Sequence, residues 1–223
     1  LMLIAGMIGM LLAADLFNLY LFCELMSISA YVLVAFRRHT DTAIEAGFKY
    51  LVMGSVGTLI MLLGIAFVYR ETGQLTLPLE NGIPGPWRRA GIACLLVGLG
   101  VKSAIVPLHT WLPDAYGRAP SSVSALLAAV ISKSTLILML KVALGLGLPA
   151  ATLGLGLLLL SFLNMTLGNG LALVQTHTKR LLAYSSIAQT GYIMFSLGIG
   201  LRYELPAALQ AGLFLLLTHA VMK

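Results

Sequence analysis

Apolar segments about as long as a bilayer is thick recur along the whole of this sequence. A helix needs about 20 predominantly apolar residues to cross the hydrocarbon core. Segments that approach this length occupy residues 1–14, 16–36, 46–69, 90–107, 120–144, 150–173, 180–200 and 206–223. We therefore expect an all-α polytopic membrane helix bundle of about eight spanning segments, the first partial and the last truncated.

The composition supports this class and excludes soluble ones. Hydrophobic residues make up 59% of the chain and charged residues only 10%, against about 25% charged residues in soluble domains. The formal charge of +6 would suggest nucleic-acid binding in a soluble protein. Here we assign it to loop Lys and Arg at the membrane surface, and we expect no nucleic-acid partner. Because Leu1 and Lys223 both lie within apolar runs, we expect a fragment of a longer protein.

The loop charges favour one orientation only weakly. Six cationic residues fall on one side and five on the other, and the positive-inside rule places the larger set in the cytoplasm. The larger set is Arg37, Arg38, Lys49, Arg118, Lys179 and Arg180.

Metal, disulfide and phosphate sites have little support. Cys23 and Cys94 lie in separate apolar segments without metal-ligand spacing, so we expect no metal site. The run from Gly98 to Ser103 lacks a glycine directly before its lysine, so it fails the phosphate-loop pattern. We expect the frequent glycines to let helices approach closely instead.

Ionisable side chains inside apolar helices are the unusual feature of this chain. Glu24, Lys102, Lys133 and His219 fall deep in predicted helices, and Lys223 follows His219 by four residues, on the same helix face. Each charge at the bilayer centre costs about 2.5–3.5 kcal/mol unless it faces a partner or water. Such residues are typical of proton relays, although structural ion pairs remain an alternative for any one of them.

Lys102 and Lys133 flank a helix break that Pro107 predicts. The polar elbow after the proline holds His109, Trp111 and Asp114. These side chains either relay protons or act as an interfacial Trp and a helix-capping Asp. A buried amine favours its neutral form and a nearby opposite charge favours the ionised form. Moving the partner away therefore releases a proton.

These residues resemble a known family. The chain is similar to the antiporter-like membrane subunits of respiratory complex I, which are related to Mrp-type cation/proton antiporters and membrane-bound hydrogenases. The stretches that carry the resemblance are AADLFNLYLFCELMSISAYVLVAF, GLGVKSAIVPLHTWLPDAYGRAPSSVSALLAAVISKSTLILMLK, QTHTKRLLAYSSIAQTGY and LLLTHAVMK.

The resemblance implies a fold of two inverted repeats, each with a broken helix. Residues 1–145 would form the first five-helix repeat, family helices four to eight with the first one truncated. Residues 146–223 would form part of the second repeat, helices nine to eleven. The resemblance also implies proton-transfer roles for Glu24, Lys102, Lys133, His219 and Lys223, with Glu24 as the ion-pair partner of Lys102.

The expected function is that of a proton-translocating membrane subunit of a redox-driven pump of the NADH-quinone oxidoreductase type. The alternatives are an Mrp-type sodium/proton antiporter subunit, a hydrogenase membrane subunit, and a scaffold with structural ion pairs. We expect no cofactor and no redox catalysis in this chain, so whether it counts as an enzyme depends on its complex. The implied partners are other membrane subunits, the lipid bilayer, and protons or sodium, in the inner (cytoplasmic) membrane.

Overall fold

A computed structural model describes residues 1–36, 40–79 and 84–223. These residues form α1 (Met2–Leu12), α2 (Leu16–Val34), α3 (Asp41–Thr72), α4 (Pro86–Lys102), α5 (Trp111–Arg118), α6 (Ser121–Leu126), η1 (Leu127–Ile131), α7 (Ser132–Gly145), α8 (Ala150–Leu173), α9 (Thr178–Arg202) and α10 (Pro206–Met222). The η1 segment is a π-helical turn that joins α6 and α7 into one helix. The described part of the chain is thus all-α, as the sequence predicts.

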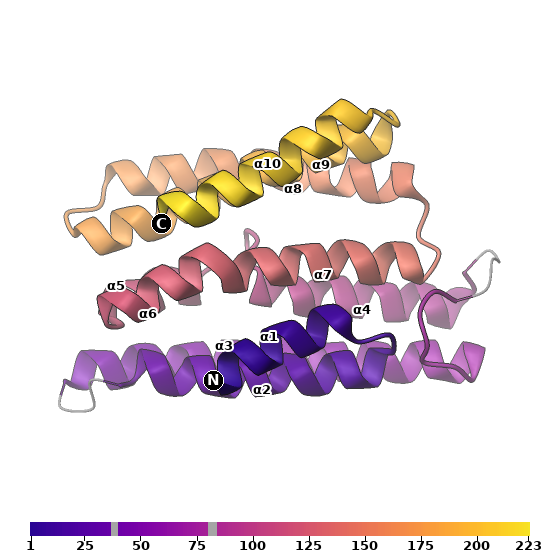
Figure 1. The fold of residues 1–223 in the computed structure, drawn as a ribbon, viewed down its shortest axis with the longest axis horizontal. Coiled ribbons are helices and arrows are strands. Elements are labelled where there is room, and N and C mark those ends of the chain that lie inside the picture. The colour runs from indigo at the N-terminus through magenta and orange to yellow at the C-terminus, as the bar shows by residue number, and fades with distance from the viewer. Residues whose placement is uncertain (37–39, 80–83) are drawn as a thin grey trace.

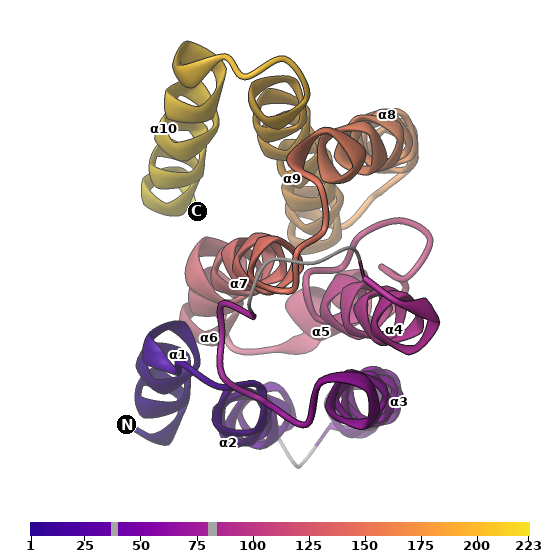
Figure 2. The same ribbon diagram turned by 90° about the vertical axis from the view of Figure 1, so that its right-hand side faces the viewer.

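The helices lie roughly along one axis (Figure 1) and stack in three tiers when viewed end-on (Figure 2). Helices α1, α2 and α3 form one outer tier, and α8, α9 and α10 form the other. The middle tier holds α4, α5 and the α6–η1–α7 helix. Helix α7 contacts α4 and α1, whereas η1 contacts α10. The middle tier therefore joins the two outer ones.

Four helices in the described residues are long and apolar enough to cross a membrane. They are α2, α3, the continuous helix Ser121–Gly145, and α8. Helices α1 and α10 are apolar but shorter. Large apolar side chains such as Phe48, Phe162 and Phe214 are exposed, which suits contact with lipid. The protein is a multi-pass membrane protein.

Local sequence signals explain several helix ends. The Asp15 carboxylate accepts a hydrogen bond from the Asn18 backbone N–H at 2.8 Å and caps the start of α2. Helix α3 ends at Gly73, whose φ of +65° lies in the left-handed region. Pro86 and Pro206 occupy first-turn positions of α4 and α10, where a missing N–H costs nothing.

The helix break differs from its prediction. The expected helix 90–107 begins earlier, at Pro86, and ends at Lys102. The chain turns at Ala104, whose φ of +54° is left-handed and costs about 1–2 kcal/mol for a residue with a Cβ. Trp111 and Asp114, expected in an elbow, lie in α5. The expected turn at 37–41 falls partly outside the described residues, because 37–39 are not among them.

Glycines let α3 and α4 pack closely just before Lys102. A Cβ placed on Gly98 would lie 2.5 Å from the carbonyl oxygen of Gly57, which is backbone and cannot move aside. Gly91 and Gly64 meet at another point of the same interface, where a Cβ on Gly91 would lie 2.8 Å from the Gly64 carbonyl oxygen. The glycines at this interface thus act as small packing residues, as the sequence predicts. By contrast, Gly156 and Gly170 have nothing within 4 Å of a Cβ.

We predict that Gly98→Ala destabilises the protein, because α4 must move away from α3 to admit the methyl group. Overpacking of this kind costs about 1–3 kcal/mol. The midpoint of thermal unfolding of the purified protein should fall. Gly156→Ala in α8 is the matched control and should leave the midpoint unchanged or raise it, since its Cβ meets open space. Equal midpoints for the two variants would contradict the packing role of Gly98.

Candidate functional site

Lys102 ends α4 at the helix break and is buried, with 2% of its surface exposed. Its Nζ donates hydrogen bonds to the hydroxyls of Ser27 and Tyr31, the latter at 3.2 Å. Nζ also lies 5.6 Å from the centroid of the Tyr31 ring. The ammonium group of Lys102 is therefore held against α2 by two hydroxyls.

Glu24 lies on the same side of α2, three residues before Ser27 and seven before Tyr31, so the three share a helix face. It is half-buried. The expected ion pair is not formed: no carboxylate oxygen of Glu24 comes within 4.0 Å of Lys102 Nζ among the salt bridges of the described residues. Ser27 and Tyr31 take the hydrogen bonds of the lysine instead.

Helix α5 contacts the end of α4 and also α3. Trp111 Nε1 donates to the carbonyl oxygen of Val101 at 2.8 Å, one residue before Lys102. The Trp111 ring also stacks on Tyr50 of α3, with centroids 4.1 Å apart. The break itself is satisfied from α8, because the Val106 N–H donates to Asn164 Oδ1 at 3.3 Å. His109 lies in the break, and its Nδ1 is buried without a hydrogen-bond partner.

Lys133 lies at the middle of the helix Ser121–Gly145 and is 2% exposed. Its Nζ donates to Thr190 Oγ1 of α9 at 3.3 Å. The π-turn η1 ends two residues earlier, and such turns often occur at functional sites. Neither buried lysine forms an ion pair with a carboxylate in the described part of the chain.

Two further hydroxyl pairs involve the residues next to the lysines in the chain. Ser103, next to Lys102, donates to Thr135 Oγ1 of α7 at 3.0 Å. Ser132, next to Lys133, shares a 3.0 Å hydrogen bond with Tyr116 Oη of α5. All four side chains are buried. Buried, exchangeable O–H groups therefore accompany each lysine.

His219 of α10 is fully buried, and neither ring nitrogen has a hydrogen-bond partner. Buried polar groups without protein partners are usually satisfied by water. Helix α10 contacts η1, which ends two residues before Lys133, and Lys223 directly follows α10. Lys133, His219 and Lys223 therefore lie in one region of the bundle. Lys223 Nζ donates to Leu182 O at 3.1 Å and to Ser185 Oγ at 3.3 Å.

A cavity of about 210 Å³ borders this region, and Lys223 lies in its wall. The wall is largely apolar but includes the polar groups of Tyr116, Ser124 and Ser186. Because Tyr116 also bonds Ser132, the cavity connects to the hydroxyl beside Lys133. Its size and these polar groups allow it to hold water.

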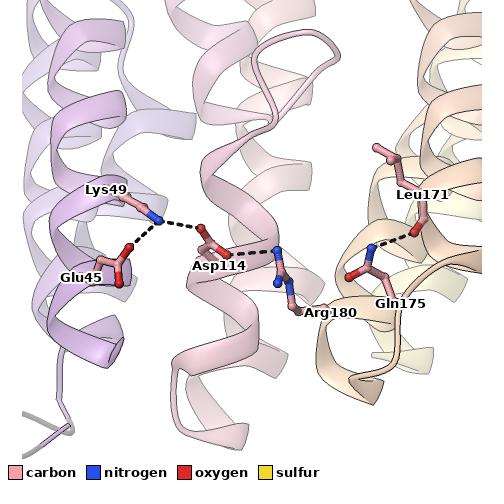
Figure 3. Close-up of polar contacts among 6 residues, drawn as sticks. All are labelled: Glu45, Lys49, Asp114, Leu171, Gln175 and Arg180. Carbon is pink, nitrogen blue, oxygen red and sulfur yellow. Dashed lines mark hydrogen bonds and ion pairs between the residues drawn. The ribbon is translucent and has the colours of Figure 1, made fainter. Parts of the chain in front are cut away.

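Sequence reasoning missed the ion network of Figure 3. Asp114 of α5 pairs with Lys49 of α3 at 3.3 Å and with Arg180 of α9 at 3.4 Å, and Lys49 also pairs with Glu45 at 2.7 Å. The sequence predicts Lys49 and Arg180 only as loop charges at the membrane surface. The residues lie far apart in sequence, so only the fold brings them together.

A family match agrees with this geometry. The family described as "NADH:quinone oxidoreductase/Mrp antiporter, TM" matches residues 13–223. The chain belongs to this family. The resemblance found in the sequence is thereby confirmed.

Individual relatives agree with the family match. F(420)H(2) dehydrogenase subunit N of Methanosarcina mazei is 39% identical over 226 residues, which cover 98% of this chain and 45% of that protein. NADH-quinone oxidoreductase subunit N of Desulforudis audaxviator is 35% identical over 227 residues, which cover 98% of this chain and 44% of that protein. The chain thus spans less than half the length of these relatives.

A solved structure has the same fold. One chain of the membrane-bound sulfane sulfur reductase, an archaeal respiratory membrane complex, superposes with a TM-score of 0.89 at 34% identity. The match covers 99% of this chain and 45% of that one. The helix arrangement described above is therefore that of an antiporter-like membrane subunit.

We predict that Ser27→Ala lowers stability by about 1.5–3 kcal/mol, the usual contribution of a hydrogen bond to a charged group. The substitution leaves the buried ammonium of Lys102 with Tyr31 alone. Ser29→Ala, on the same helix, is the control because the Ser29 hydroxyl bonds the Leu25 carbonyl oxygen of its own helix. Unfolding midpoints of the two variants should differ clearly. A Ser27→Ala midpoint no lower than that of Ser29→Ala would contradict the assignment.

Proposed function

We propose that this chain is the proton-conducting part of a proton-translocating membrane subunit in a redox-driven complex of the NADH-quinone oxidoreductase type. The observation that carries the proposal is the pair of buried lysines, Lys102 and Lys133, whose hydrogen-bond partners in the described part of the chain are hydroxyls. Burial in an apolar environment disfavours the charged form of a lysine. An amine in such a site is suited to carrying a proton that it later gives up.

The hydroxyls and the cavity beside Tyr116 would supply the route. Ser103, next to Lys102 in the chain, and Thr135 would offer O–H groups on the way to Lys133. From Lys133 the route would continue toward His219 and Lys223, since α10 contacts η1 close to Lys133. Water in the cavity beside Tyr116 and Ser132 would exchange protons with the aqueous side. No step of this route needs a metal or a cofactor.

Glu24 acts as the electrostatic switch for Lys102 in this proposal. It shares a helix face with the two hydroxyls that hold the lysine, but it makes no direct contact with it in this conformation. If the carboxylate approached, it would favour the ammonium form of Lys102, and if it withdrew, it would release the proton. Redox chemistry in other subunits would drive the alternation.

We predict that Lys102→Ala and Lys133→Ala each lower proton translocation at least about tenfold, while the complex still assembles. Proton uptake into liposomes that hold the full-length protein in its complex is the measurement. Lys141→Ala is the matched control from the same helix as Lys133, since Lys141 bonds the carbonyl oxygens of Leu11 and Ala13 near the end of α1. Glu24→Gln should give a graded loss.

The scaffold alternative makes the opposite prediction. If the buried lysines were only structural, an assembled Lys102→Ala complex would translocate protons at the wild-type rate. That result would remove the basis of the relay.

The family description includes Mrp antiporters, so sodium/proton exchange is the second candidate function. The same residues would carry it, with sodium moving against the proton. Proton uptake that depends on a sodium gradient, without any electron donor, would favour this candidate. Uptake that requires the donor and is indifferent to sodium would favour the redox-driven pump.

The remaining expectations belong to the same proposal. The partners are further membrane subunits of a complex, as in the respiratory membrane complex that holds the structural relative. The membrane is the inner (cytoplasmic) one, with the Arg118 and Lys179 side toward the cytoplasm. Electron transfer takes place in other subunits.

A further inference from the structure

We propose that the Asp114 carboxylate is a positioning group that fixes α5 between α3 and α9, and thereby sets the rate at which the two buried lysines exchange protons. This rests on the proposed function. Asp114 itself contacts neither lysine. It acts through α5, the eight-residue helix that follows the break.

The carboxylate of Asp114 bridges two outer tiers of the bundle. Its Oδ2 lies 3.3 Å from Lys49 Nζ of α3, and its Oδ1 lies 3.4 Å from Arg180 Nη2 of α9. Figure 3 shows Asp114 between the two cations, with Glu45 on the far side of Lys49. Asp114 follows Lys49 by 65 residues and precedes Arg180 by 66. One carboxylate therefore joins three helices that are distant along the chain.

The close approach of Arg180 is built into α5. A Cβ on Gly117 would lie 3.0 Å from Arg180 Cγ, so the glycine makes room for the arginine stem. Lys179, the preceding residue, donates from Nζ to the Ala119 carbonyl oxygen at 2.9 Å, at the end of α5. Two consecutive cationic residues of α9 thus contact the same short helix. Arg180 pairs with the Asp114 carboxylate, and Lys179 bonds the backbone at the end of α5.

Two other side chains of α5 bond groups next to the two lysines. Trp111, three residues before Asp114, bonds the Val101 carbonyl oxygen beside Lys102. Tyr116, two residues after Asp114, bonds Ser132 beside Lys133. A shift of α5 therefore changes the surroundings of both lysines together. A helix of two turns has little packing surface of its own, so its position depends on such ties.

The ion network is partly exposed, which makes it sensitive to salt. The side chains of Asp114, Arg180 and Lys49 are 29%, 37% and 49% exposed. Exposed ion pairs are weak, each worth about a 1.5- to 5-fold factor in an equilibrium, and salt screens them. Loss of the Asp114 carboxylate should therefore slow proton exchange at the two lysines without abolishing it.

The test is Asp114→Asn in the full-length protein within its complex, with Arg118→Gln as the matched control. Arg118 is an exposed cation of the same helix and forms no ion pair in the part of the chain that the structure describes. Hydrogen exchange of the amides at 111–118 and proton uptake into liposomes are both measured, at low and high salt.

We expect Asp114→Asn to speed exchange in α5 about 2- to 10-fold at low salt and to slow translocation by a similar factor. High salt should bring the wild type close to the variant. Asp114→Glu should restore much of both properties, and Arg118→Gln should change neither. If Asp114→Asn does not assemble, Lys49→Gln and Arg180→Gln carry the test, because each removes one of the two ion pairs.

Wild-type exchange or wild-type translocation in an assembled Asp114→Asn complex would overturn the proposal. Lys102→Ala, measured in the same liposomes, separates this failure from failure of the relay. If that variant translocates normally, the relay is wrong, while the exchange data still decide whether Asp114 holds α5.

Discussion

The structure depends on burying lysine ammonium groups among apolar helices without carboxylate partners. Lys102 and Lys133 are each 2% exposed, and among residues 1–36, 40–79 and 84–223 their hydrogen-bond partners are hydroxyl groups. Hydroxyls stabilise an ammonium less than a carboxylate does, since an ionised acceptor gives the stronger hydrogen bond. Helices that bring such groups together must therefore be held by other contacts. The glycine-lined α3–α4 interface and the α5 ion network provide them.

The helix break also brings together helices around the buried Lys102. Ending α4 at Lys102 exposes the last carbonyl groups of a helix, and these are satisfied locally or by Trp111. The N–H of Val106 is satisfied by Asn164 from another tier. Irregular backbone at membrane depth is tolerated only when protein or water satisfies it. The break therefore joins α4, α5 and α8 as well as providing room beside the lysine.

The sequence predicts helices well here because apolar length is a strong signal in membranes. The predicted spans 16–36, 150–173 and 206–223 differ from α2, α8 and α10 by two residues or fewer at each end. Charged residues in apolar runs also identified Lys102, Lys133 and His219, which are all buried. The partners were not predictable. Ser27, Thr190 and Asn164 are ordinary polar residues in sequence, and only the fold places them beside the lysines and the break.

The π-turn at Leu127–Ile131 has a consequence for Lys133. The hydrogen bonds of a π-turn span five residues instead of the four of an α-helix, so the turn accommodates one inserted residue. If the turn reverted to α-helical bonding, every later side chain would rotate by about 100° and advance by about 1.5 Å relative to α6. The Lys133 amine would then leave Thr190 and face another helix. The π-turn thus determines which helix the Lys133 amine faces. The register of α7 relative to α6 could change this neighbour without any change in charge.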